Sequence, residues 1–293
     1  MLEEKVILEA PELWDTAWEE IKKRTGTPEM QITSMPTLSE KIWGLHRREF
    51  MVLGGRTSQG KSDLALQIAS DVAKQGFQVY FLSLEMSEQA IIERLFCNLA
   101  MINNYDLFYK PNEFEKQSQE FREIIQDRKL IITYKIGSRI NDLYQFIEDL
   151  PKADLVILDY IQAVQGIGDK LSIVNDYILK FRQLCVDKNF AGIMVSQINR
   201  GSEMTENKRP NLWQLKSSGT LEEHADTVLL GFWEHHYDNS KPFNDYDIII
   251  AKQRNGMTGT VKVKFLAPNS RFEEKEIGGM YGKIQQPDKP RYC

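Results

Sequence analysis

The chemistry of this chain centres on a glycine-rich segment, Gly-x-x-x-x-Gly-Lys-Ser, that follows the apolar run FMVLG. Its glycines allow backbone dihedrals that a Cβ would forbid, so successive N–H groups can surround a phosphate at the amino end of the next helix. In such a loop the lysine reaches the β- and γ-phosphates, and the serine hydroxyl holds Mg²⁺. The sequence therefore predicts a site for ATP and Mg²⁺. The residues of this phosphate loop are Gly55, Arg56, Thr57, Ser58, Gln59, Gly60, Lys61 and Ser62.

Polar residues at the ends of apolar strands would complete ATP hydrolysis, which needs a metal-side carboxylate, a base for the attacking water and a γ-phosphate sensor. Asp159 ends the run LVILD and is the expected second partner of Mg²⁺, the alternative being a helix-capping aspartate. Tyr160 follows it, so the base must come from elsewhere. Glu85 follows strand 77–84, which we expect beside the phosphate-loop strand, and would accept a proton from water; alternatively, it only opens the next helix. Gln197 ends the run AGIMVSQ and would sense the γ-phosphate, because an amide donates and accepts hydrogen bonds without titrating.

Two cations near the C-terminus are candidates for contact with a phosphate bound to a neighbouring copy. Lys252 and Arg254 alternate along IIIAKQRNG, and alternate residues of a strand share a face. A pair at this spacing could grip one phosphate group. If the pair projects from the edge of the subunit, it completes the neighbour's ATP site only in an oligomer. The alternative is a solvated strand edge.

The composition is that of a globular protein without a membrane segment. The 293 residues are 42% hydrophobic and 27% charged, and no apolar run is long enough to span a bilayer. The net charge of −5 argues against a uniformly basic nucleic-acid surface but leaves room for a local basic channel. Cys97, Cys185 and Cys293 are widely spaced, and the first two sit in helical patterns. We therefore expect core cysteines in a reducing cytoplasm.

Apolar runs that alternate with helical patterns predict an α/β fold: a mainly parallel twisted sheet with helices on both faces and antiparallel strands at the end. The expected strands cover 49–53, 77–84, 130–134, 154–159, 191–197, 226–232, 246–252 and 260–266. The expected helices cover 61–75, 87–102, 112–127, 139–150 and 171–188. The expected parts of the chain are an N-terminal arm over 1–34, an ATPase domain over 35–273 and a C-terminal tail over 274–293.

The N-terminal arm contains one expected amphipathic helix over 11–23, with Trp14 and Trp18 on its apolar stripe. This stripe needs a cover, which is either the chain's own domain or a neighbouring copy. The polar segment over 24–37 contains two prolines and little periodicity, which predicts a linker.

Several blocks of the chain resemble the replicative DNA helicases of the DnaB family in order and approximate spacing over about residues 36–273. These blocks are GGRTSQGKS, SLEMS, LVILDYIQ, VSQINR, SSGTLEEHADTVLL and IIIAKQRNGMTGTVKVKF. The resemblance implies a RecA-like ATPase core in a hexameric ring that holds ATP between subunits and translocates 5′ to 3′ along single-stranded DNA. It assigns Lys61 and Ser62 to the nucleotide and metal, Asp159 to the metal, Glu85 to the attacking water, Gln197 to the γ-phosphate, and Lys252 and Arg254 to the neighbour's ATP. The compartment is then the bacterial cytoplasm, or the host cytoplasm if the chain is encoded by a phage.

Two features depart from the family pattern. Members usually carry an N-terminal helical domain that helps to recruit primase, whereas here the helix over 11–23, which in the family packs on the adjacent subunit, precedes the core. The DNA-contacting loop usually has the sequence Asp-Leu-Arg-Glu-Ser-Gly, whereas this chain has Gln-Leu followed by Lys216, Ser217, Ser218 and Gly219. Lys216 and backbone N–H groups would still bind DNA phosphates. The expected partners are single-stranded DNA, further copies of the chain, and a primase or helicase loader.

Two other functions fit parts of the sequence. A recombinase that coats DNA as a filament shares the core, but the KQRNG and SQINR blocks match the helicases better. An ATP-binding regulatory or loading factor that does not unwind DNA fits the short N-terminus and the altered loop. The full set of hydrolytic residues argues against a purely structural role.

Overall fold

The alternation of strands and helices that the sequence predicts is present in the computed structural model, which describes residues 10–11, 14–15, 18–19, 29–134, 139–160, 170–199, 208–215 and 218–274. The helices are α2 (Pro36–Ile42), α3 (Lys61–Lys74), α4 (Glu88–Ala100), α5 (Asn104–Tyr109), α6 (Glu115–Gln126), α7 (Ile140–Glu148), α8 (Lys170–Asp187) and α9 (Ser218–His224). The strands are β1 (Phe50–Gly55), β2 (Val79–Ser83), β3 (Leu130–Tyr134), β4 (Leu155–Asp159), β5 (Ala191–Gln197), β6 (Thr227–Phe232), β7 (Asp245–Gln253), β8 (Gly259–Leu266) and β9 (Arg271–Glu274).

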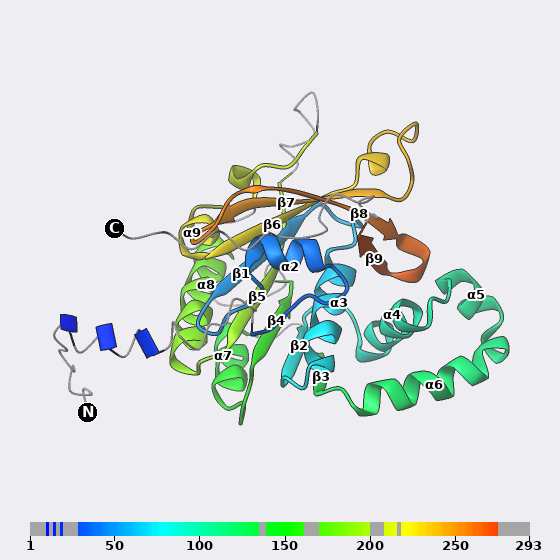
Figure 1. Ribbon diagram of the computed structural model, residues 1–293, viewed down its shortest axis with the longest axis horizontal. Helices are drawn as coiled ribbons and strands as arrows, with labels where there is room; N and C mark the ends of the chain where they lie inside the picture. Colours follow the sequence, from blue (N-terminus) through cyan, green and yellow to red (C-terminus); the bar gives the residue numbers. More distant parts are fainter. Residues whose placement is uncertain are drawn as a thin grey trace, which may run out of the picture.

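One twisted sheet organises the part of the chain that the structure describes, with strand order β3-β2-β4-β5-β1-β6-β7-β8-β9 (Figure 1). The strands from β3 to β6 in this order run parallel, and β7, β8 and β9 are antiparallel to their neighbours. This confirms the predicted mainly parallel sheet with an antiparallel end. All eight expected strands are present. The sequence analysis missed β9, whose four residues are too few for a periodic pattern.

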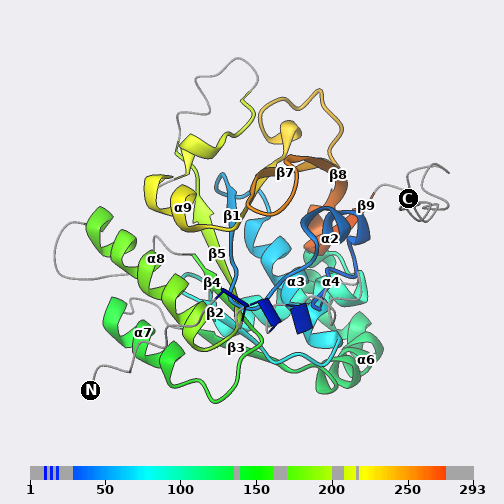
Figure 2. The same cartoon turned by 60° about the vertical axis from the view of Figure 1, so that its left-hand side comes forward.

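Alternate residues of β1 face two separate hydrophobic cores. Met51 and Leu53 pack with the buried side chains of α3 and α4, whereas Phe50 and Val52 pack with those of α7 and α8. In Figures 1 and 2 these two helix pairs lie on opposite faces of the sheet. A strand covered on both faces is apolar throughout rather than alternating, which is why β1, β2 and β4 are completely buried.

The order of the strands corrects one expectation. The sequence placed β2 beside β1, but β2 pairs with β3 and β4, and β1 pairs with β5 and β6. The crossover through α3 therefore passes over two strands, β5 and β4. Apolar pattern identifies a strand but contains no information on which neighbour it takes, because each buried strand offers the same backbone hydrogen bonds.

The segment over 24–37 is not a linker in its described part. Met30, Ile32 and Met35 are completely buried, and Met30 forms a β-bridge with Leu45. The backbone N–H and the hydroxyl of Ser34 both donate to the Asp71 carboxylate. Three isolated apolar residues make no periodic pattern, so this packing could not be predicted from the sequence. The packed domain thus extends at least to residue 30, before the expected boundary at 35.

The two ends of the chain lie largely outside the described residues. Of the expected helix over 11–23, Trp14 and Trp18 are described; both are exposed, and their rings stack 5.5 Å apart. Its packing on a neighbouring subunit therefore stays a prediction. Residues 275–293 are not described. Among the described helices, none combines the length and the apolar character that crossing a bilayer requires. Cys97 and Cys185 are buried, as the sequence predicts.

Candidate functional site

The phosphate loop joins β1 to α3 through backbone conformations that glycine tolerates best. Gly60 has a φ of 72°, and a Cβ there would lie 2.7 Å from the Phe265 ring. Ser58 also has a positive φ, of 61°. Among the described residues, no side chain caps the amino end of α3. A helix terminus of this kind, with a lysine and a serine as its first residues, is suited to an anion such as a phosphate.

Lys61 folds back over the loop. Its Nζ donates a 2.7 Å hydrogen bond to the backbone carbonyl of Arg56. Burial lowers the pKa of Lys61 to about 8, although Asp159 and Glu85 partly oppose this shift. A bound polyphosphate would supply the anionic partner that the burial of this ammonium group calls for.

The other candidate residues reach the same edge of the sheet from three further strands. Four strands lie side by side in the sheet in the order β2-β4-β5-β1. Glu85 follows β2, Asp159 ends β4, Gln197 ends β5 and the phosphate loop follows β1. The register aligns Ser83 with Asp159 and Gly55 with Gln197. Parallel strands place their carboxyl ends at one edge, where α/β sheets bind ligands. The structure therefore brings together these candidates, although they are distant in sequence.

Asp159, which is buried, and Ser62, which is half-buried, offer a pair of oxygen ligands. Asp159 is 3% exposed. Burial raises its pKa to about 6, against the opposing effects of a hydrogen bond with Ser62 and of the charge on Lys61. The peptide bond between Asp159 and Tyr160 is cis. A hydroxyl and a carboxylate beside a phosphate loop fit Mg²⁺, which takes oxygen ligands and is bound by one or two carboxylates together with phosphate oxygens. Within the described residues there is no cluster of three or more His, Cys, Asp or Glu side chains that could hold a metal without the nucleotide.

Glu85 lies in an exposed turn between β2 and α4. The Ser83 hydroxyl accepts a 2.9 Å hydrogen bond from the N–H of Met86, and Ser87 caps α4 by accepting one from the N–H of Ala90. Glu85 is therefore not the residue that opens the helix, which was the alternative to a catalytic role. Its charge acts on both Lys61 and Asp159, so it is close to the phosphate loop.

An ion pair that the sequence analysis missed connects α3 and α4 beside this site. Arg94 Nη1 lies 3.0 Å from Oδ1 of Asp63, the residue after Ser62, and Asp63 is largely buried. The charge of Arg94 also acts on Asp159. No local signal in the sequence marked Asp63, because the buried residues of α3 also include the polar Gln67 and Ser70. Its partner is 31 residues away and carries no local mark.

The predicted sensor lies next to the segment that leads to the predicted DNA-contacting loop. Ile198 forms a β-bridge with Leu215, and the N–H of Asn199 donates to the carbonyl of Gln214. Gln197 therefore precedes a direct backbone connection to residues 214–215. The loop residues Lys216 and Ser217 lie outside the described part of the chain, whereas Ser218 and Gly219 begin α9, with Gly219 exposed.

Lys252 and Arg254 lie at the opposite end of the sheet from the phosphate loop. The N–H of Arg254 donates to the carbonyl of Asp226, whose own N–H donates to the carbonyl of Phe50 at the start of β1. The length of a six-residue strand, roughly 17 Å, separates that point from the loop. Lys252 Nζ donates to the carbonyls of Glu222 and Glu223 in the last turn of α9. The structure thus does not bring these two cations to the site of their own subunit.

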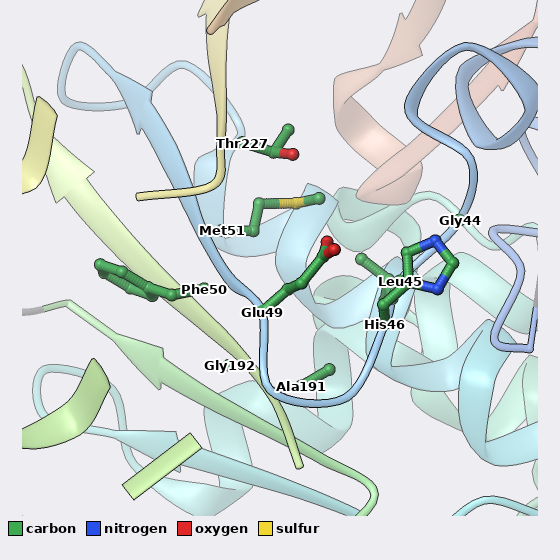
Figure 3. Close-up of a pocket in the computed structure, with 9 residues that line it drawn as sticks. All are labelled: Gly44, Leu45, His46, Glu49, Phe50, Met51, Ala191, Gly192 and Thr227. Atoms are coloured by element: carbon green, nitrogen blue, oxygen red, sulfur yellow. The ribbon is translucent and has the colours of Figure 1, made fainter. Parts of the chain in front are cut away.

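The cavity shown in Figure 3 is also far from the phosphate loop. It lies at the starts of β1, β5 and β6, where His46, Glu49 and Thr227 contribute polar groups among its lining residues. It has room for about one water molecule. This cavity is therefore not a candidate for binding a nucleotide.

A phosphate loop after β1, with a buried carboxylate at the end of a nearby parallel strand, defines the chain as a phosphate-loop protein with a RecA-like α/β core. A family model described as the DnaB-like helicase C terminal domain matches residues 32–274. The chain belongs to this DnaB-like helicase family.

Curated relatives and solved structures agree with this family. The chain is 30% identical over 273 residues to the replicative DNA helicase DnaB of Leifsonia xyli subsp. xyli, and the match covers 85% of this chain and 56% of the relative. It is 29% identical over 262 residues to the replicative DNA helicase DnaB of Geobacillus stearothermophilus, with 84% and 58% covered. The chain thus spans a little under three fifths of the length of these relatives.

Two similar structures support the fold. A solved ATPase domain matches with a TM-score of 0.83 and 25% identity, over 92% of this chain and 100% of that one. A DnaB-like replicative helicase, described together with its interactions with primase, matches with a TM-score of 0.80 and 25% identity, over 92% and 68%.

Proposed function

We propose that this chain is an ATP-driven DNA motor. Copies of it assemble into a ring, taken as hexameric from the family resemblance. They hydrolyse ATP in sites between subunits and move 5′ to 3′ along single-stranded DNA. The proposal extends the replicative helicase role of the family to this chain.

The residues of one subunit would bind the nucleotide and activate water. The loop N–H groups and Lys61 hold the phosphates, and Ser62 with Asp159 holds Mg²⁺. When bound, Mg²⁺ would supply positive charge against the β- and γ-phosphate oxygens. Glu85 accepts a proton from the attacking water, and Gln197 contacts the γ-phosphate. The neighbour's Lys252 and Arg254 stabilise the charge that develops in the transition state.

One observation carries this proposal: the groups that we expect to act in hydrolysis lie at the two opposite ends of the parallel strands of a single chain. Lys61, Asp159 and Glu85 lie at one end, where the charge of each carboxylate acts on the lysine. Arg254 contacts Asp226 at the other edge. A subunit with this division supplies most of one site and the missing cations of another. A ring or filament of identical copies is the arrangement in which every site is complete.

The function is tested by unwinding of a forked DNA duplex, with electron microscopy of the assembled particles. We expect closed rings with a central hole, and ATP-dependent unwinding that requires a 5′ single-stranded tail and is not supported by a 3′ tail alone. Lys61→Ala is the matched control, because it removes the phosphate contact and should abolish unwinding. Filaments that exchange DNA strands would instead identify a recombinase. ATP turnover without unwinding of the DNA duplex, whichever tails it carries, would favour a regulatory or loading factor.

Lys216→Ala is expected to weaken binding to single-stranded DNA equally for different sequences and to reduce the salt dependence of binding by about one phosphate contact. The reason is that Lys216 precedes Ser218 and Gly219 in the predicted DNA-contacting loop. Binding is measured by fluorescence anisotropy over a range of salt concentrations. Lys116→Ala is the control, since Lys116 is an exposed lysine on α6, 86% accessible and far from this loop in sequence. An unchanged salt slope for Lys216→Ala would assign the DNA contact to other residues.

A further inference from the structure

Asp226 connects the start of the sheet to Arg254. It lies directly before β6 and is 5% exposed. Its Oδ2 accepts a 2.8 Å hydrogen bond from the N–H of Phe50 and lies 3.3 Å from Nη2 of Arg182. Its Oδ1 accepts a 2.9 Å bond from Nη1 of Arg254, and its backbone carbonyl accepts the N–H of the same residue at 2.8 Å. Asp226 therefore holds Arg254 by both its main chain and its side chain.

Both terminal nitrogens of the Arg254 guanidinium have partners in their own subunit, but the side chain is only half-buried. Its Nη2 lies 3.3 Å from the carbonyl of Glu223, yet 49% of the side chain is exposed. A charge-assisted hydrogen bond to a buried carboxylate restricts an otherwise long and flexible side chain. Because a guanidinium has five N–H donors, these two contacts leave further donors for a partner in a side chain that is half exposed.

We propose that Asp226 is a positioning residue that sets the guanidinium of Arg254 for contact with the nucleotide of the adjacent subunit. This inference rests on the proposed function, in which Arg254 acts across the subunit boundary. Asp226 touches neither nucleotide nor water in this role. It acts through Arg254 by fixing the direction from which the cation enters the neighbour's site.

A second aspartate with similar surroundings separates this role from a structural one. Asp154 lies directly before β4 and is 4% exposed. It accepts the N–H of Gln78 at 2.7 Å and pairs with Arg47 at 2.6 Å. Its backbone carbonyl accepts the N–H of Ala191. The side chain of Arg47 is only 23% exposed and also pairs with Glu29. Asp154 therefore shares the backbone contacts and one arginine contact of Asp226, but among the residues that the structure describes it has no counterpart of Arg182, and its own arginine is less exposed than Arg254.

The test compares Asp226→Asn with Asp154→Asn in the assembled protein. For each variant, melting temperature, particle shape, nucleotide affinity and ATP turnover are measured. Asp226→Asn is expected to lower kcat by about 10²-fold, the scale of a reacting-group misplacement of about 1 Å, with nucleotide affinity nearly unchanged. Asp154→Asn should show a comparable loss of melting temperature with kcat close to that of the unmodified protein.

The results separate failure of this inference from failure of the proposed function. If Asp226→Asn lowers kcat no more than Asp154→Asn does, Asp226 is structural and the inference is overturned. If Arg254→Ala itself keeps full turnover, Arg254 does not act in hydrolysis. The proposed function then fails at this residue, independently of the result for Asp226. Where Asp226→Asn does not fold, Asp226→Glu replaces it, because it keeps the charge but moves the carboxylate by one methylene. A reduced kcat with unchanged affinity then supports the inference, and full turnover overturns it.

Discussion

Arg254→Ala is expected to lower ATP turnover by about 10³- to 10⁵-fold at most, while nucleotide affinity changes far less. An arginine that enters from the neighbour stabilises charge that develops only in the transition state, so its loss affects kcat rather than binding. The geometry supports this expectation, since Arg254 is held by Asp226 at the end of the sheet away from its own phosphate loop. Turnover is measured in the assembled protein, and affinity by direct titration with a fluorescent nucleotide.

Arg47→Ala is the matched control for this variant. Arg47 also pairs with a buried aspartate that precedes a strand, but it has a second carboxylate partner, Glu29, and its side chain is less exposed than that of Arg254. Its loss should lower stability and leave turnover nearly intact. A large loss of turnover in Arg47→Ala would show that any broken ion pair at this end of the sheet has the same effect.

Mixing of two inactive variants tests whether the cation acts between subunits. Arg254→Ala subunits keep the phosphate loop, and Lys61→Ala subunits keep the cation, so co-assembled particles contain some complete sites. Partial recovery of ATP turnover is expected where neighbouring sites can act independently. The contrary outcome is turnover by wild-type monomers, proven to be monomeric in the assay, at the rate of the assembled protein. In that case Arg254 has no role in trans.

Glu85→Gln is expected to lower ATP turnover by about 10²- to 10⁴-fold with nucleotide affinity nearly unchanged, because an amide cannot accept the proton of the attacking water. The phosphate loop is unaffected by this change. The structure supports the role in two ways: Glu85 acts electrostatically on Lys61 and Asp159, and Ser87 rather than Glu85 caps α4. Steady-state turnover and equilibrium nucleotide binding are measured on the same preparation.

Glu88→Gln is the control for Glu85→Gln. Glu88 is an exposed carboxylate three positions further on, in the first turn of α4. Its loss removes the same charge from a nearby position, but it should have little effect on turnover. Turnover of Glu85→Gln near that of the unmodified protein would remove Glu85 from the mechanism and leave the proton acceptor to be found elsewhere.

Features that depend on a few neighbouring residues could be predicted from the sequence. The Gly-Lys-Ser pattern determines the phosphate loop, because positive φ at Gly60 and a helix beginning at Lys61 follow from residue type. The parallel strands β1, β2, β4, β5 and β6 were identified because strands buried on both faces are continuous apolar runs, whereas β7 and β8 alternate buried and more exposed residues. Asp159 and Gln197 could be assigned to the site for a related reason: each ends such a run, and parallel strands end at the same edge.

Features that depend on distant partners could not be predicted in this way. The burial of Met30 and Ile32 was hidden within a polar, proline-containing segment, since isolated apolar residues show no periodicity. The Arg94–Asp63 pair links side chains 31 positions apart, and neither is distinguished by its local sequence. The separation of β2 from β1 by two strands was missed for the same reason.

The sequence by itself therefore determined the phosphate-binding chemistry, the type of fold and the residues that reach one edge of the sheet. Dihedral preference and hydrophobic periodicity act over a few residues, so short segments of the sequence are enough to determine these properties. The tertiary structure alone decided the strand order, the pairing of Asp226 with Arg254 and the position of that arginine at the opposite edge from its own phosphate loop. Many strand orders offer equivalent backbone hydrogen bonds. The observed order is the one that buries both helix layers at once, so it depends on the packing of the whole chain and not on any short segment.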